Sequence, residues 1–104
     1  MLNQVVMVGR MVADLEVSTE GEKEKAILKI AIPRSFKNAD GEYETDFVAC
    51  SLWDGIAKNT AEYCKKGDIV GIKGRIQSRD GAIEIIAEKV TFLSSKSKDI
   101  NQEG

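Results

Sequence analysis

The sequence predicts an all-β fold, a five-stranded Greek-key barrel with one helix between its third and fourth strands. Two observations indicate this class. Stretches of alternating apolar and polar residues have the period of half-buried strands, and Gly-containing polar segments separate them. A single segment, between the third and fourth stretches, has the spacing of an amphipathic helix. The length of 104 residues suits one domain with one core.

Two strands are predicted before the first long loop. Val5 to Val8 is an apolar run, and Gly9-Arg10 interrupts it where a barrel strand often bends. The polar segment from Thr19 to Lys23 is predicted as a turn. Apolar residues then alternate strictly from Ala26 to Ile32, and Pro33 is expected to end this strand because proline donates no ladder hydrogen bond.

The third strand and the helix follow. Residues 34–45 are predicted as a solvated loop or a loose hairpin tip that turns at Asp40-Gly41, and Phe47 to Trp53 as the third strand. Asp54 is expected to be the N-cap of the helix, and Gly67 the glycine just after its C-terminus. The residues predicted to face inward are Ile56, Ala57, Thr60, Ala61 and Cys64.

The last two strands are predicted at Ile69 to Arg79 and Ala82 to Leu93, joined by a tight turn at Asp80-Gly81. Three strands, a helix and two strands, in this order, describe the OB-fold. The domain is expected to span residues 1–93, and residues 94–104 to form a polar flexible tail.

The composition excludes several classes of function. The chain has no histidine, which removes Ser-His-Asp and Cys-His catalysis and HExxH zinc sites, and Cys50 and Cys64 alone cannot complete a tetrahedral metal site. We therefore expect no enzyme activity and no cofactor, and reduced packing cysteines in a cytosolic protein. No apolar run approaches the ~18 residues of a membrane span, and no signal-peptide segment opens the chain.

The candidate functional surface is the strand face opposite the core. Phe47 and Trp53 lie opposite the apolar residues of the third strand. The basic residues on the corresponding side of the second and fourth strands are Lys29, Lys73, Arg75 and Arg79. If these strands are neighbours in one curved sheet, aromatic and basic side chains interleave, which suits stacked bases and charged phosphates. The net charge of -2 does not exclude this, because the acidic residues cluster in other segments.

The same pattern fits a second interpretation. Phe47 and Trp53 would be buried in an interface between subunits, and the charged residues would form an ordinary solvated sheet face. Alternation by itself does not decide between the two interpretations.

Five fragments, in order, resemble the bacterial single-stranded DNA-binding proteins over roughly residues 1–93. Each fragment is modest by itself, but five in order over one domain form a specific signal. They are Asn3 to Met11, Arg34 to Asn38 with Gly41-Glu42, the set Phe47, Cys50 and Trp53, the pair Lys66-Gly67, and Gly74 to Ile76 with Arg79.

The resemblance implies an OB-fold that binds single-stranded DNA in the cytoplasm, associated with the nucleoid. It implies assembly, usually as a homotetramer, with a dimer as the alternative. It also implies that Phe36, Phe47 and Trp53 stack on bases. The basic residues that it places on or beside the DNA path are Lys29, Arg34, Lys73, Arg75 and Arg79.

Three features depart from the family. Arg79 to Ala82 closes a tight turn where relatives usually have a longer hairpin, so a smaller DNA site is expected. Asp99 to Gly104 lacks the acidic, Phe-containing tip with which the family recruits replication and repair proteins, which leaves such partners open. Val48 stands where some relatives place a polar residue at subunit contacts, which leaves the oligomeric state open.

The leading hypothesis is sequence-independent binding and protection of single-stranded DNA in replication, recombination or repair. One alternative is an OB-fold primosome accessory or mobile-element protein that acts mainly by docking to replication proteins. A third is a structural module for oligomerisation.

Overall fold

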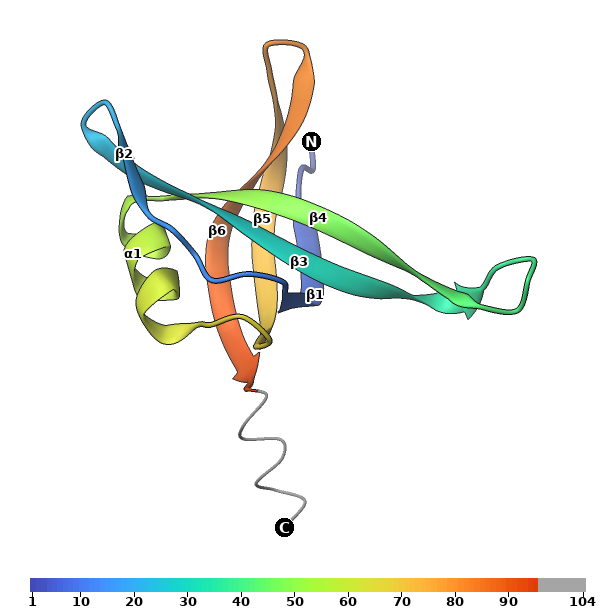
Figure 1. Ribbon diagram of the computed structural model, residues 1–104. Coiled ribbons are helices and arrows are strands. Elements are labelled where there is room, and N and C mark those ends of the chain that lie inside the picture. Colours follow the sequence, from blue (N-terminus) through green and yellow to red (C-terminus); the bar gives the residue numbers. More distant parts are fainter. Residues whose placement is uncertain (96–104) are drawn as a thin grey trace.

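The structure confirms the predicted barrel (Figure 1). The computed structural model describes residues 1–95, so residues 96–104 of the predicted tail lie outside the described part. The strands are β1 (Val5–Met11), β2 (Ser18–Glu20), β3 (Lys23–Lys37), β4 (Tyr43–Trp53), β5 (Ile69–Arg79) and β6 (Ala82–Ser94). They form one sheet in the order β1-β5-β6-β4-β3-β2, and β1 also pairs with β3, which closes five strands into a barrel.

Alternate side chains of the strands fill a single core. On β3 the residues Ala26, Leu28 and Ile30 are buried, as the alternation predicts. Leu28 lies opposite Cys50 of β4, so both strands turn the same face inward. The other large side chains that are nearly inaccessible are Met11, Leu52, Val70 and Ile72.

The short strand β2 was not predicted. It pairs with the start of β3 around a turn in which Gly21 has φ +67°. All three of its residues are exposed and polar, so it shows no alternation of apolar and polar residues from which a strand could be inferred.

The prediction that Pro33 ends its strand is wrong. Pro33 pairs with Thr45, and β3 continues to Lys37 after a shift of register. Pro33 is the last residue before this shift, and sheets accept proline at such irregularities. Residues 34–45 therefore form a two-stranded arm with its tip at residues 38–42, which extends away from the barrel in Figure 1.

Helix α1 (Asp54–Tyr63) packs against β3, β4 and β6 with the predicted inward face. Its start differs from the prediction, because Trp53 occupies the N-cap position and makes no side-chain cap. Asp54 is the first helical residue, with φ +49°. Its Oδ1 accepts the backbone N–H of Glu24 at 3.1 Å, so this carboxylate joins the helix to β3 instead of capping it.

The end of the helix also differs from the prediction. The helix stops at Tyr63, with Cys64 as its C-cap, so Gly67 is not the glycine that follows it directly. The carboxylate of Asp68 accepts the N–H of Lys65 at 2.8 Å and stabilises the turn that leads the chain towards β5. Gly67, at φ +94°, belongs to this turn, and its N–H donates to the carbonyl of Met11 at 2.9 Å.

The tight turn between β5 and β6 is confirmed. Arg79 pairs with Ala82, and the two residues between them, Asp80 and Gly81, have φ +52° and +81°. Two central residues with positive φ match the right-handed twist of the flanking strands. The resulting hairpin rises beyond the end of the barrel in Figure 1.

Both cysteines are free and buried, as predicted for packing residues. Burial raises the pKa of the Cys50 thiol to about 11 and also raises the pKa of Cys64. At neutral pH both thiols are therefore protonated and weakly reactive.

Gly74→Ala is expected to destabilise the barrel. Gly74 lies at a register shift between β5 and β6, and a Cβ there would overlap the carbonyl oxygen of Ile86. Overpacking against backbone should lower the free energy of unfolding by about 1–3 kcal/mol, measured by urea denaturation. Gly55→Ala in α1 is the matched control, since no atom lies within 4 Å of a Cβ at that position. Equal urea midpoints for the two variants would contradict this account.

Candidate nucleic-acid interface

The outer surface of β3 and β4 carries aromatic and basic residues in register. The strand pairing places Lys25 opposite Trp53 and Ala31 opposite Phe47, on the face away from the core. Lys29 lies between these pairs on β3. Trp53 and Phe47 are six positions apart on β4, which corresponds to about 20 Å along the strand.

The predicted strands share one sheet, but their order differs from the simplest expectation. β4 does not border β5, because β6 lies between them. β6 meets β4 in parallel at a single register pair, Ser51 with Ile86. This contact brings the outward-facing residues of the β5–β6 hairpin, among them Arg75 and Arg79, beside Trp53.

Three open hollows follow the outer face of β3 and β4, and we call them together the binding path. The Trp53 pocket, of about 540 Å³, is lined by Trp53 with Glu20, Lys23, Arg75, Gln77, Arg79 and Ile86. The β3 groove, of about 460 Å³, lies between residues 13–18 and β3 and includes Lys25 and Lys29. The Phe47 pocket, of about 260 Å³, is lined by Phe47 with Val12, Lys29, Val48 and Ala49.

Two lysines connect these hollows. Lys29 lines both the β3 groove and the Phe47 pocket. Lys25 lines the β3 groove, and its Nζ lies 4.9 Å from the centroid of the Trp53 ring. An ammonium over an indole face is attracted by the ring quadrupole, so Lys25 is held at the Trp53 end of the path.

Trp53 lies beside a network of two cations and two carboxylates. The ammonium of Lys25 is 3.7 Å from the carboxylate of Glu20 and 4.0 Å from that of Glu84. Arg79 pairs with the same two carboxylates, at 4.0 Å from Glu20 and 3.7 Å from Glu84. Two of the cations beside Trp53, Lys25 and Arg79, are thus ion-paired in the free chain.

Glu84 is the anchored member of this network. Its side chain is only 15% exposed, and it accepts the Ser51 hydroxyl at 2.6 Å and the Gln77 amide N–H at 3.2 Å. The Ser51 hydrogen bond is the main cause that holds the pKa of Glu84 below its ordinary value, with Gln77 and the neighbouring cations adding to it. Glu84 therefore stays ionised at neutral pH.

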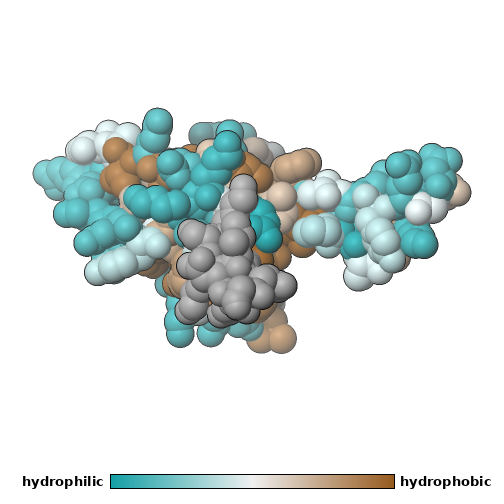
Figure 2. Space-filling view, turned by 60° about the horizontal axis from the view of Figure 1, so that its bottom comes forward, coloured by the Kyte–Doolittle hydropathy of each residue, from teal (hydrophilic) through white to brown (hydrophobic). Residues whose placement is uncertain are grey.

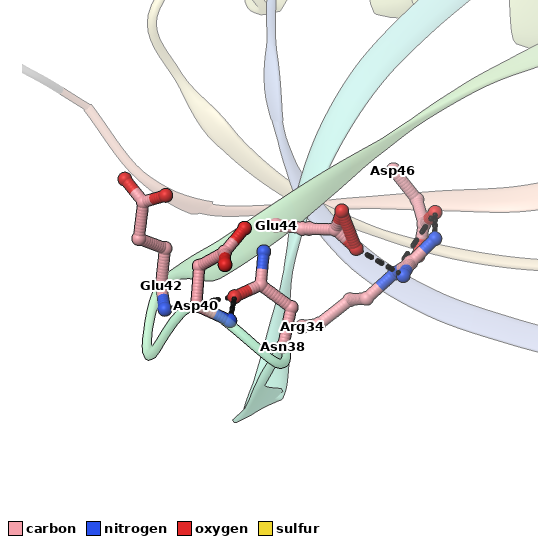
Figure 3. Close-up of polar contacts among 6 residues, drawn as sticks. All are labelled: Arg34, Asn38, Asp40, Glu42, Glu44 and Asp46. Carbon is pink, nitrogen blue, oxygen red and sulfur yellow. Dashed lines mark hydrogen bonds and ion pairs between the residues drawn. The ribbon is translucent and has the colours of Figure 1, made fainter.

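Arg34 lies on the arm between two carboxylates (Figure 3). Its Nη1 is 2.8 Å from Glu44, while its Nη2 and Nε are 2.8 and 3.1 Å from Asp46. The hydrogen bonds from Arg34 lower the pKa of Asp46. The family resemblance placed Arg34 on or beside the DNA path. In the free chain its guanidinium is instead hydrogen-bonded to the carboxylates of Glu44 and Asp46.

The arm exposes aromatic side chains on an acidic background. Phe36 is 64% exposed, and Phe47, where the arm joins the barrel, is 74% exposed. Tyr43, which the sequence analysis did not single out, is 60% exposed, with the Lys37 ammonium 5.7 Å from its ring. Figure 2 shows the arm, on the right, as a largely hydrophilic projection. Its carboxylates are Asp40, Glu42, Glu44 and Asp46, against the two cations Arg34 and Lys37.

The remaining predicted residues divide between two regions. Arg75 lines the Trp53 pocket, donates to Gln77 at 2.8 Å and lies 3.7 Å from Glu88. Lys73 instead pairs with Val6 of β1 and with Lys89 of β6, so it lies on the β1–β5–β6 side of the barrel. The structure therefore brings Trp53, Arg75 and Arg79 together and leaves Lys73 apart from them.

Sequence reasoning did not include Lys25, Glu20 and Glu84 in this site. Lys25 could have been found from the sequence, because it lies four positions before Lys29 on β3 and side chains an even number of positions apart share one face of a strand. For Glu20 and Glu84 no local signal existed. Their contacts depend on the edge strand β2 and on the meeting of β4 with β6, which are long-range features.

Among residues 1–95, no group of three or more His, Cys, Asp or Glu side chains could hold a metal ion. The described part of the chain also contains no helix with the length and apolar character needed to cross a membrane.

The closed five-stranded barrel with one helix is an OB-fold. Aromatic and basic side chains along the outer face of one strand pair are typical of OB-folds that bind single-stranded nucleic acids. The chain belongs to the Single-strand binding protein family, whose profile matches residues 2–93. This confirms the resemblance found in the sequence fragments and agrees with the expectation of a non-enzymatic protein.

Similar proteins carry the corresponding names. Single-stranded DNA-binding protein B of Bacillus subtilis is 42% identical, with 95% of this chain and 96% of that protein aligned. Single-stranded DNA-binding protein 3 of Streptococcus agalactiae is 39% identical, with 100% of this chain and 84% of that protein aligned. A crystal structure of a deletion mutant of the single-stranded DNA binding protein from Thermus aquaticus superposes with a TM-score of 0.72 at 21% identity. The superposition covers 93% of this chain and 53% of the Thermus aquaticus chain, and it supports the fold.

The titration of Glu84 tests the geometry of the Trp53 pocket. Because its folded-state pKa is lowered, Glu84 stabilises the fold at neutral pH, and this contribution is lost as the pH falls through the folded-state value. Carboxyl NMR should show a midpoint below 4.5, the ordinary value for glutamate. Ser51→Ala should raise that midpoint, since the Ser51 hydroxyl is the largest cause of the shift. A Glu84 midpoint that Ser51→Ala leaves unchanged would contradict the hydrogen bond.

Proposed function

We propose that this chain binds single-stranded DNA without sequence preference and protects it during replication, recombination or repair. The observation that carries the proposal is the binding path, on which Trp53 and Phe47 alternate with Lys25 and Lys29 over about 20 Å of one strand pair. The relatives named single-stranded DNA-binding proteins support the same ligand. The work of such a protein is stoichiometric, in the cytoplasm and in contact with the nucleoid.

The mechanism combines stacking with replacement of counterions. Bases stack on Trp53, Phe47 and, further along the arm, Phe36, because every base has a π-face and stacking therefore tolerates any sequence. Lysine and arginine side chains along the path replace the counterions of the phosphates, so affinity falls as salt rises. The main phosphate contacts assigned here are Lys29, Arg75 and Arg79, with Arg34 engaged once it leaves Asp46. Lys73, which pairs with Val6 on the β1–β5–β6 side, is not among them.

The cations beside the aromatic residues favour DNA binding over a purely structural role. Phe47 is 74% exposed in the single chain, so its ring adds little to the core, and this exposure alone suits a subunit interface as well as a stacked base. A docking module for replication proteins, the alternative from the sequence, would not require cations beside each of the two aromatic rings on β4. The named relatives likewise favour DNA binding.

We further propose that the chain acts as a homotetramer. The outer face of β1, β5 and β6 supports association, because Val6, Val8 and Leu93 are 71%, 51% and 50% exposed there. Val8 lies opposite Gly71, and a Cβ on Gly71 would touch both Val8 and Leu93, so these residues form one apolar area. Contiguous exposed apolar surface marks a site of protein association. It lies apart from the Trp53 pocket and would leave that pocket open.

Trp53→Ala should weaken DNA binding without unfolding the protein. The loss of one stacked base should cost about 1–3 kcal/mol in affinity for a labelled poly-pyrimidine oligonucleotide, measured by fluorescence anisotropy. In the wild-type chain, Trp53 emission should be quenched on titration, and the quenching should weaken as salt rises.

Tyr63→Ala is the control for this measurement. Tyr63 is 69% exposed on α1 and outside the binding path, so its removal should leave the affinity unchanged. Wild-type affinity in Trp53→Ala, with an unquenched Trp53 in the native chain, would refute the assignment and would favour an interface role for this ring.

Val8→Asp should disrupt the assembly. A carboxylate buried at an apolar contact is costly, so light scattering should show a homotetramer of the 11.4 kDa chain for the wild type and a smaller species for the variant. A wild-type chain that stays monomeric would contradict the proposed assembly, and a dimer would support the smaller alternative.

A further inference from the structure

The network beside Trp53 contains two carboxylates that differ in how they are held. Glu20 lies on the exposed edge strand β2, its side chain is 53% exposed, and its ion pairs are with Lys25 and Arg79. Glu84 is 15% exposed and is fixed in addition by two neutral donors, the Ser51 hydroxyl and the Gln77 amide. The first carboxylate is free to move when its cations leave, whereas the second is not.

We propose that these carboxylates have opposite roles in binding single-stranded DNA. Glu84 is a positioning residue, which holds Lys25 and Arg79 at the Trp53 end of the binding path. Glu20 competes with DNA phosphates for the same two cations and is displaced when DNA binds. The inference rests on the proposed function and adds two residues that act on affinity through other side chains.

The role of Glu84 follows from its fixed position. Lysine and arginine side chains lose much rotamer freedom when a ligand orders them, and a cation already held by an anchored carboxylate loses less. Lys25 has three donors and Arg79 has five, so each can face Glu84 on one side and a phosphate on the other. The hydrogen bonds from Ser51 and Gln77 keep Glu84 in place. Lys25 and Arg79 can therefore exchange Glu20 for a DNA phosphate on their solvent-exposed side and stay paired with Glu84.

The role of Glu20 follows from its exposure. Its distances to Lys25 and Arg79 are 3.7 and 4.0 Å, in solvent, where an ion pair contributes little. A phosphate that arrives together with a base stacked on Trp53 gains from both contacts and replaces such a pair. Removal of Glu20 therefore removes a competitor without disturbing the anchor.

This inference predicts changes of opposite sign from two substitutions that remove the same charge. Glu20→Gln should tighten binding of a poly-pyrimidine oligonucleotide by about two- to fivefold, the range of an exposed ion pair. Glu84→Gln should weaken it several-fold. It should also reduce the slope of log affinity against log salt by about 0.7 for each phosphate contact that is no longer made.

Two further variants separate positioning from simple charge. Ser51→Ala changes no charge but removes the 2.6 Å hydrogen bond to Glu84, so it should weaken binding in the same direction as Glu84→Gln. Glu62→Gln removes a negative charge from the exposed side of α1, outside the binding path, and should leave the affinity almost unchanged. Circular dichroism and thermal melting confirm the fold of each variant, and Ser51→Ala decides the question if Glu84→Gln does not fold.

The possible results distinguish the two proposals. If Glu84→Gln binds DNA more tightly, to the same extent as Glu20→Gln, both carboxylates act only by repelling phosphates and the inference is overturned. Wild-type affinity in Ser51→Ala would also overturn it. In either case the proposed function stands, because the wild-type chain binds. A wild-type chain that does not bind the oligonucleotide overturns the proposed function and the inference together.

Discussion

The parallel contact between β4 and β6 at Ser51 and Ile86 determines where the functional side chains meet. It closes the barrel on that side and places the β5–β6 hairpin against the end of β4. The hydrogen bond from Ser51 to Glu84 joins the same two strands through their side chains. Without this contact, Arg75 and Arg79 would project from a free hairpin, and Lys25, which the pairing of β3 with β4 places opposite Trp53, would be without them beside the ring. The closure of the barrel is thus also the assembly of the Trp53 pocket.

The fold and the two aromatic residues on β4 could be predicted because they depend on local patterns. Alternation assigns faces within a strand, so Phe47 and Trp53 were placed opposite the core from parity alone. For residues 34–45 the sequence left open a solvated loop or a loose hairpin tip, and the two strands of the arm were not predicted because Pro33 looks like a terminator. Pro33 instead pairs with Thr45 in the arm. Asp54 was assigned as a cap because the type of residue is right for one, but Glu24, thirty residues earlier, offers its carboxylate a better partner. In both cases the prediction used the local preference of one residue type, whereas the structure is decided by a contact with another segment of the chain.

Most of the cations assigned to DNA are paired with carboxylates in the free chain. The pairs are Arg34 with Glu44 and Asp46, Arg75 with Glu88, and Lys25 and Arg79 with Glu20 and Glu84. Each solvent-exposed pair is weak, so no single pair prevents binding. Together they discriminate against isolated anions, which would have to displace a carboxylate with only one contact. On the proposed function, a strand that offers many phosphates and stacks its bases would exchange the exposed pairs and leave those of Glu84 in place, so the arrangement would select for a polymer.

The two ends of the binding path differ in the interaction that dominates. At the Trp53 end, Glu84 pairs with two cations beside a half-buried ring, so the proposed phosphate contacts and base stacking would act together there. The arm and its base at Asp46 carry four carboxylates, which repel phosphates, against two cations, so the role proposed for Phe36 rests on stacking by its 64% exposed ring. Near its turn, the β5–β6 hairpin carries cations but no aromatic ring. The hairpin is short there, because Asp80 and Gly81 alone join Arg79 to Ala82. The residues proposed to stack on bases therefore all lie on β3 and β4, the strand pair that forms the binding path.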